Sequence, residues 1–195
     1  MSKAPKRRTR NIPEKRARII SAAQILFTQR GYTHTSIKEI ASRAEVAVGL
    51  VIRHFESKLK LFETALIEAL THSPVDSSTK ADFGIRLAKV VLSEETKVVF
   101  PAMVMLSIED EEARRVAMKV FREFGIKPAA RWLGSPLAAE RAIYVNLLGL
   151  SLALLDRLFG PELPADLDFL PVKWIIESIQ RAVDNTDCSN ASPYK

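Results

Sequence analysis

Apolar side chains recur every three or four residues through positions 12–72, a spacing that one face of an α-helix produces and a β-strand does not. The first such helix begins at Pro13, which suits an initial helical position, and ends at Gly31. Its apolar face consists of Ile19, Ala23, Leu26 and Phe27. No alternating strand pattern competes elsewhere in the sequence, so we predict an all-α protein.

Three shorter helices are predicted after Gly31. The second begins at Ser36, and Glu39 follows three residues later, which is the spacing of a capping box. The third covers residues 48–55, and its apolar face is formed by Val51 and Phe55. Ser57 caps the fourth, whose apolar stripe ends before residue 74. Residues 12–72 are therefore predicted to form one small helical domain.

A polar stretch around residues 73–79 predicts the boundary to a second, larger helical domain, residues 73–185. Its helices are expected at about 80–93, 95–107, 109–124, 137–158 and 171–184. Stretches that contain glycine and proline, residues 125–128 and 160–164, are interpreted as joints between these helices. Residues 1–11 are expected to be a disordered basic arm, and residues 186–195 a flexible tail.

Charge is unevenly distributed along the chain. Residues 1–60 hold 14 Lys and Arg against 4 Asp and Glu, whereas residues 61–195 hold 15 against 19. The N-terminal part therefore attracts polyanions, and DNA is the expected partner because binding releases condensed counterions. A solubilising basic arm would explain the charge alone equally well.

Other bulk features exclude several classes of protein. Cys188 is the single cysteine, so a disulfide framework is excluded, and we expect a cytoplasmic protein. No secretory signal is recognised, and the longest apolar run, residues 142–155, is shorter than the ~20 residues that cross a bilayer, so no membrane partner is expected. The three histidines are too scattered for a zinc motif, and no cofactor is expected. Ser57 and Lys60 match the catalytic pattern S-x-x-K, but its companion motifs are missing, so we predict no enzyme.

Three segments resemble the tetracycline-repressor (TetR) family of regulators: GYTHTSIKEIASRA at residues 31–44, GLVIRHFESK at 49–58, and Leu61-Phe62. The resemblance covers about residues 12–70. It implies a three-helix N-terminal DNA-binding domain with a helix-turn-helix made by the second and third helices, followed by a larger ligand-binding and dimerisation domain. It also implies a homodimer formed by the last two long helices, which are predicted here at 137–158 and 171–184.

The third helix is expected to enter the major groove of DNA. Ala47 and Gly49 are short enough to let the backbone approach base edges, and Arg53 is the candidate for a bidentate guanine contact. His54 can donate to a phosphate or base, and the resemblance implies that Thr35 and Lys58 grip phosphate. The full predicted contact set is Thr35, Ser36, Ala47, Val48, Gly49, Leu50, Ile52, Arg53, His54 and Lys58. The alternative is that Val48, Val51, Ile52 and Phe55 simply form a core stripe.

Three positions depart from the family pattern. Glu45 stands where a glycine is usual, Ala47 where a Ser or Thr cap is common, and Ile52 where a tyrosine often touches phosphate. Arg53 is then the main polar side chain with which this helix can contact base edges. We therefore expect direct base contacts to supply a modest part of the sequence specificity and the shape of the groove to supply a larger part. The basic arm is expected to add contacts in a minor groove.

The C-terminal domain is expected to enclose a pocket for a small apolar or amphipathic effector. Its candidate lining residues are Phe83, Phe100, Met103, Phe121, Phe124, Tyr144 and Asn146. Each of them could equally be ordinary core. The helix at 137–158 is apolar on several faces and must be covered, either by the subunit itself or by a second copy.

The function predicted from these features is a sequence-specific regulator, a repressor that an effector releases from a palindromic operator in double-stranded DNA. The alternative is a non-specific architectural DNA-binding protein without an effector. A packaging protein has little use for a large, apolar and net-acidic C-terminal domain. The effector, the operator and the regulated genes are not determined by the sequence, nor is repression as opposed to activation.

Overall fold

The computed structural model describes residues 12–72, 79–93, 100–160, 167 and 169–185. All regular elements in these ranges are helical, in agreement with the predicted fold class. The predicted arm, most of the predicted boundary segment and the tail with Cys188 lie outside the described residues.

The N-terminal part contains four helices, α1 (Ile12–Arg30), α2 (Ile37–Arg43), α3 (Val48–Phe55) and α4 (Lys58–Thr71). α1 and α4 pack against each other through aromatic side chains. The Phe27 and Phe62 rings meet edge to face with centroids 4.9 Å apart, and Tyr32 lies 5.2 Å from Phe62. Edge-to-face contacts of this kind add to the gain from apolar burial. This core fixes the platform that carries α2 and α3.

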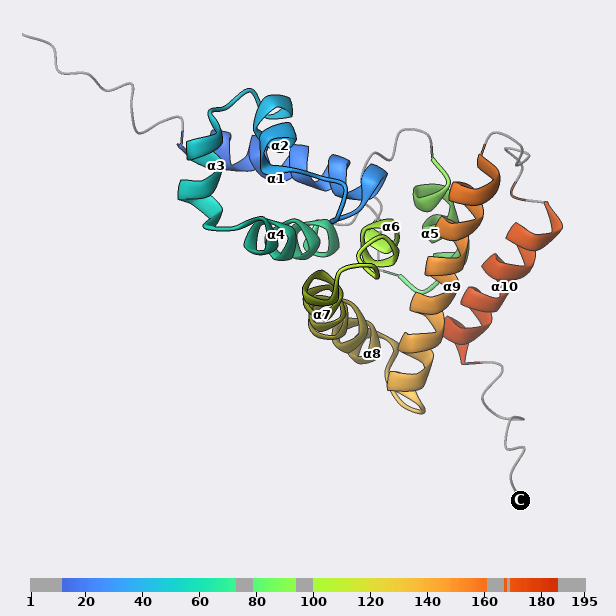
Figure 1. Cartoon of the computed structure of the whole chain (residues 1–195). Coiled ribbons are helices and arrows are strands. Elements are labelled where there is room, and N and C mark those ends of the chain that lie inside the picture. Colours follow the sequence, from blue (N-terminus) through green and yellow to red (C-terminus); the bar gives the residue numbers. More distant parts are fainter. Residues whose placement is uncertain (1–11, 73–78, 94–99, 161–166, 168, 186–195) are drawn as a thin grey trace, which may run out of the picture.

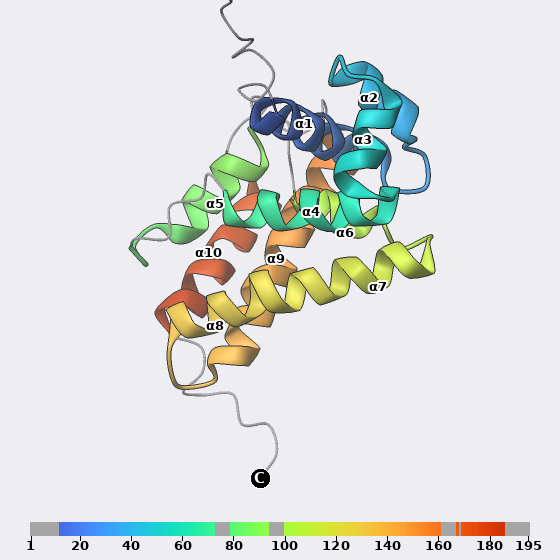
Figure 2. The ribbon, with the colours of Figure 1, turned by 90° about the vertical axis from the view of Figure 1, so that its left-hand side faces the viewer.

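The remaining described residues form a second group of helices (Figures 1 and 2). These are α5 (Phe83–Val91), α6 (Phe100–Met105), α7 (Glu111–Val120), the π-helical η1 (Phe121–Ile126), α8 (Lys127–Leu133), α9 (Ala138–Phe159) and α10 (Leu170–Asp184). α9 packs against both α8 and α10, and Figure 1 shows α9 and α10 side by side in opposite directions. Within this group, α6 and α7 lie next to the N-terminal helices, with α6 against α1 and α7 against α4.

The predicted joint at residues 125–128 is wrong, because the chain stays helical from α7 through η1 into α8, a helix that the sequence did not predict. The amide of Lys127 donates to the carbonyl of Arg122, five residues back, which widens the turn. Pro128 then occupies the start of α8, where its missing N–H costs nothing. Gly125 and Pro128 therefore mark a π turn and not a break.

α6, α7 and η1 share one hydrophobic cluster with the N-terminal helices, whereas α5, α8, α9 and α10 are built on a second cluster. Met103 of α6 and Ala117 of α7 are fully buried in the same cluster as the side chains of α1 and α4. Gly31, at φ +77°, packs so closely on the α6–α7 turn that a Cβ there would lie 2.6 Å from the Leu106 carbonyl oxygen. Arg157 of α9 donates to the carbonyls of Thr28 and Gln29 at the end of α1. A displacement of α6 or α9 would therefore change contacts at the end of α1 directly.

α9 is long and apolar enough to cross a bilayer by length and composition, with 22 residues and a mean hydropathy of 1.5 over its most apolar window. Only 28% of that window is buried. Six large apolar side chains on α9 are exposed: Ile143, Tyr144, Leu147, Leu154, Leu158 and Phe159. Leu170 and Trp174 on α10 are exposed as well. We call these eight residues the α9–α10 face.

Candidate nucleic-acid interface and effector cavity

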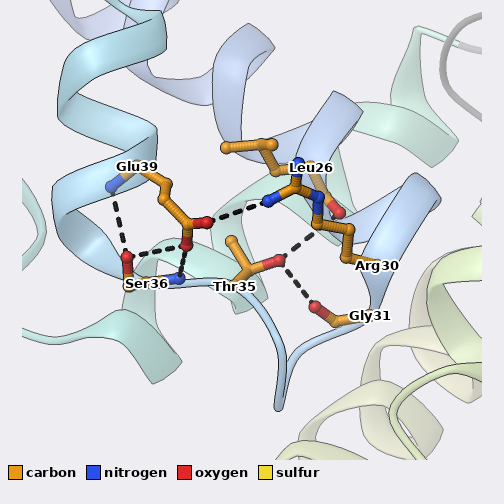
Figure 3. A network of polar contacts seen from close by, with 6 residues as sticks. All are labelled: Leu26, Arg30, Gly31, Thr35, Ser36 and Glu39. Carbon is orange, nitrogen blue, oxygen red and sulfur yellow. Dashed lines mark hydrogen bonds and ion pairs between the residues drawn. The ribbon is translucent and has the colours of Figure 1, made fainter.

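The start of α2 is held by the predicted capping box (Figure 3). The Ser36 hydroxyl accepts the amide of Glu39 at 3.2 Å, and the Glu39 carboxylate accepts the amide of Ser36 at 2.8 Å. The Ser36 hydroxyl also donates to this carboxylate, and Arg30 pairs with it at 2.8 Å. The hydrogen bonds from Ser36, above all from its hydroxyl, hold the pKa of Glu39 below its usual value. The Ser36 hydroxyl is exposed but fully engaged within the chain, so its predicted contact with DNA would require the box to open.

Thr35 has a different role from the one predicted. Its side chain is only 2% exposed, and its hydroxyl donates to the carbonyl of Gly31 at 2.7 Å (Figure 3). A buried hydroxyl cannot grip a phosphate, so this prediction is corrected. Thr35 instead secures the turn between α1 and α2, and that turn sets where α2 begins.

The turn between α2 and α3 is built on Glu45, which adopts φ +52°. This left-handed conformation costs a non-glycine residue about 1–2 kcal/mol, which explains why glycine is usual there. Arg18 of α1 supports the turn by donating to the Ala44 carbonyl and pairing with the Glu45 carboxylate at 2.8 Å. Ala47 occupies the N-cap of α3 and makes no side-chain cap bond. α1 thus helps to fix the angle at which α3 leaves the turn.

α3 buries one face and exposes the other. Val51 and Phe55 are 0% and 5% exposed and pack in the core, whereas Val48 and Ile52 are 44% and 45% exposed. The alternative that all four form a core stripe is therefore wrong for Val48 and Ile52. A Cβ on Gly49 would meet nothing within 4 Å, so no contact within the chain requires a glycine there. Ala47 and Arg53 are also exposed, and Leu50 and His54 are half-buried.

Basic side chains flank this exposed face. Arg53 has no hydrogen bond or ion pair with another described residue, so its guanidinium is free to bind a partner. Arg16 of α1, which sequence analysis missed, lies 5.5 Å from the Phe55 ring at the end of α3. Lys58 is turned inward: its ammonium donates to the Tyr32 carbonyl at 3.0 Å and lies 4.0 Å from the Tyr32 ring centroid. Burial lowers the pKa of Lys58, against an opposing effect of Asp110.

A cavity of about 310 Å³ lies among α4, α5, α6, η1, α8 and α9. Five predicted effector residues line it: Phe83, Phe100, Phe121, Phe124 and Asn146. Two others do not. Met103 is fully buried in the core beside α4, and Tyr144 is 45% exposed on the α9–α10 face. Met103 on α6 and Tyr144 on α9 have the same apolar character as the lining residues of their own helices, so only the direction in which each side chain points separates them from those residues.

The model of the family "Bacterial regulatory proteins, tetR family" matches residues 19–65, which include α2, the turn and α3. This N-terminal segment of the chain therefore matches the TetR family.

Two relatives of this chain carry the names of transcriptional regulators. The "HTH-type transcriptional repressor KstR" of Rhodococcus jostii is 34% identical over 89 residues, which cover 44% of this chain and 41% of the relative. This match spans less than half of that protein. The "HTH-type transcriptional regulator TtgR" of Pseudomonas putida is 28% identical over 170 residues, covering 80% of this chain and 71% of the relative.

Solved structures extend the likeness to the C-terminal helices. Reduced NemR of Escherichia coli superposes with a TM-score of 0.65 at 17% identity, covering 87% of this chain and 97% of that one. A TetR-family regulator from Mesorhizobium loti gives 0.59 at 17% identity, covering 89% and 95%. At such identities the likeness concerns the fold alone.

The part of the cavity wall that α8 provides was not predicted from the sequence. Pro128, Ala129, Trp132 and Leu133 all line the cavity. If residues 125–128 are interpreted as a joint, no helix is predicted at the position of α8. An apolar spacing of Ala129, Trp132 and Leu133 was the available signal for this helix.

Proposed function

We propose that this chain is a cytoplasmic transcriptional repressor that binds a palindromic DNA operator as a homodimer and is released by a small-molecule effector. The observation that carries the proposal is the exposed face of α3, where Val48, Gly49, Ile52 and Arg53 all lie outside the core. An exposed apolar helix face that also carries the guanidinium of Arg53, unpaired among the described residues, suits a major groove, where thymine methyl groups and guanine acceptors are read.

Dimerisation is proposed through the α9–α10 face. Ile143, Leu147, Leu154 and Leu158 follow each other at helical spacing and are 44–66% exposed. Trp174 on α10, 55% exposed, extends the same kind of surface. A two-fold interface would bury these side chains and present two copies of α3 to half-sites about 34–36 Å apart.

Release is proposed to start at the cavity. Ala69 and Leu70, in the last turn of α4, form part of its wall, and Phe100 of α6 forms another part. A ligand that pushes on α4 displaces the helix that directly follows α3. A ligand that displaces α6 also moves Leu106, which packs closely on Gly31. A switch from 1:99 to 99:1 requires the ligand to prefer one state by about 5.5 kcal/mol.

Binding measurements test the DNA-binding part of this proposal. DNA is first selected from a random library with the full chain, and its affinity is then compared with that of shuffled DNA across salt concentrations. A repressor retains its preference for the selected DNA as salt rises, whereas an architectural protein binds both alike.

Arg53→Ala is expected to cost about 1–3 kcal/mol of affinity for the selected DNA and to relax the preference at one base pair of each half-site. The physical reason is the loss of a bidentate contact to guanine. Fluorescence anisotropy with selected and shuffled DNA measures the effect. Arg115→Ala, an exposed arginine on α7 with 71% side-chain exposure, serves as the control and should change neither affinity. An equal loss on both DNAs with Arg53→Ala contradicts a base-reading role.

A further inference from the structure

We infer that the cavity takes an uncharged, largely aromatic molecule of one or two rings that donates one hydrogen bond to Asn146. The inference rests on the proposed function, because it names the class of effector for that regulator. It depends on the charge, the polarity and the size of the cavity.

No described residue that lines the cavity carries a charge. Five aromatic rings face it: Phe83, Phe100, Phe121, Phe124 and Trp132. An ion that left water for this wall would lose its hydration without gaining an opposite charge, which costs several kcal/mol. Aromatic rings instead favour flat apolar ligands, which pack in stacked or edge-to-face geometry. The wall therefore selects against both carboxylates and ammonium groups.

Lys80 is a cation close to the cavity, because it contacts two of the residues that line it. Its ammonium donates to the Leu133 carbonyl at 2.8 Å and lies 5.8 Å from the Trp132 ring centroid. Lys80 itself is exposed and does not line the cavity. Its charge therefore remains hydrated, and its contacts stabilise the start of α5 against α8.

Asn146 is the amide side chain among the described lining residues, and a hydrogen bond to a neighbouring carbonyl fixes its orientation. Its side chain bonds to the carbonyl of Ala142 at 2.7 Å. A carbonyl oxygen only accepts, so the atom facing it must be the amide nitrogen. No described residue donates to the amide oxygen, which lies 3.8 Å from the point where a Cβ on Gly125 would stand. A ligand that completes this site must bring a donor, such as a hydroxyl.

The size of the cavity limits the ligand. Its volume of about 310 Å³ is at the lower end of the range for small-molecule sites, roughly 300–1,000 Å³. A side chain at Gly125 would narrow it further, because its Cβ would stand 3.1 Å from the Phe121 ring. One or two rings fit this space.

A series of four biphenyl probes tests the inference with the full wild-type chain by isothermal titration calorimetry, without DNA. The probes are 4-phenylphenol, 4-fluorobiphenyl, biphenyl-4-carboxylate and biphenyl-4-ylmethylammonium, which share one apolar body. 4-Phenylphenol is expected to bind about tenfold tighter than 4-fluorobiphenyl, because only the phenol donates a hydrogen bond. Both ions are expected to bind at least about a hundredfold more weakly than the phenol. Tighter binding of either ion, equal binding of the two neutral probes, or binding of none overturns the inference.

Asn146→Leu provides the second readout. This variant should bind 4-fluorobiphenyl at least as well as the wild type and should lose the preference for the phenol. A preference that survives in Asn146→Leu contradicts the assigned contact.

The same probes separate this inference from the proposed function. If the phenol binds as expected but does not release selected DNA, the ligand class stands and the proposed release is wrong. If selected DNA is bound and no probe binds, the ligand class is wrong and the proposal of DNA binding stands.

Discussion

Leu147→Glu is expected to convert the proposed dimer into a monomer and to lower the affinity for selected DNA at least about a hundredfold, because the two half-sites are then no longer bound by one linked molecule. Leu147 is 53% exposed on α9, in the same row as Ile143 and Leu154. In a two-fold interface its side chain would be buried against the partner. A carboxylate in that position would lose its hydration without gaining a partner.

Sedimentation equilibrium measures the association state of this variant, and anisotropy measures DNA binding. Ile108→Glu is the matched control, since Ile108 is also an exposed apolar residue, 63% exposed, but lies outside the α9–α10 face. The control should remain a dimer and keep wild-type affinity. A Leu147→Glu protein that remains dimeric contradicts the assignment of this face.

Arg141→Met is expected to lower the free energy of unfolding by about 3 kcal/mol, since hydrogen bonds to a charged group contribute about 1.5–3 kcal/mol each and are only partly replaced by water. Arg141 of α9 is 4% exposed. Its guanidinium donates to the carbonyls of Ala182 and Val183 at the end of α10, and to those of Gly134 and Pro136 between α8 and α9. The charge therefore faces a helix C-terminus, whose dipole favours a cation.

Urea unfolding at one fixed protein concentration measures this loss, because the stability of a dimer depends on concentration. Arg131→Met on α8 is the control, since Arg131 is exposed and has no hydrogen bond or ion pair with another described residue. The control should change stability by less than about 0.5 kcal/mol. A loss below about 1 kcal/mol for Arg141→Met would show that the carbonyls find other donors.

The N-terminal helices could be predicted from the sequence because local signals agree there. The capping box of Ser36 and Glu39 lies within four consecutive residues and needs no knowledge of the fold. The apolar face of α3, Val51 and Phe55, likewise follows from helical spacing. Motif spacing also indicated the family, and the match to residues 19–65 confirms it.

Features that depend on tertiary contact could not be predicted. Thr35 was assigned to DNA by resemblance, but its hydroxyl is used by the Gly31 carbonyl, which only the folded turn brings near. Met103 and Tyr144 have the right chemistry for the cavity and point elsewhere. The π turn at Gly125 resembles a break in the sequence, because the same residue types serve both. Arg141 gave no sequence signal, since its partners are backbone carbonyls.

Directed strand cleavage tests whether the exposed face of α3 lies in a DNA groove. In a Cys188→Ser background, which removes the single native cysteine, an iron chelate is attached through Ile52→Cys or, separately, through Met118→Cys on α7. Both native side chains are similarly exposed, 45% and 43%. We predict cleavage of bound DNA from position 52 at two places about 34–36 Å apart, and none from position 118. Cleavage from position 118 alone, or none from position 52 while DNA is bound, would contradict the account.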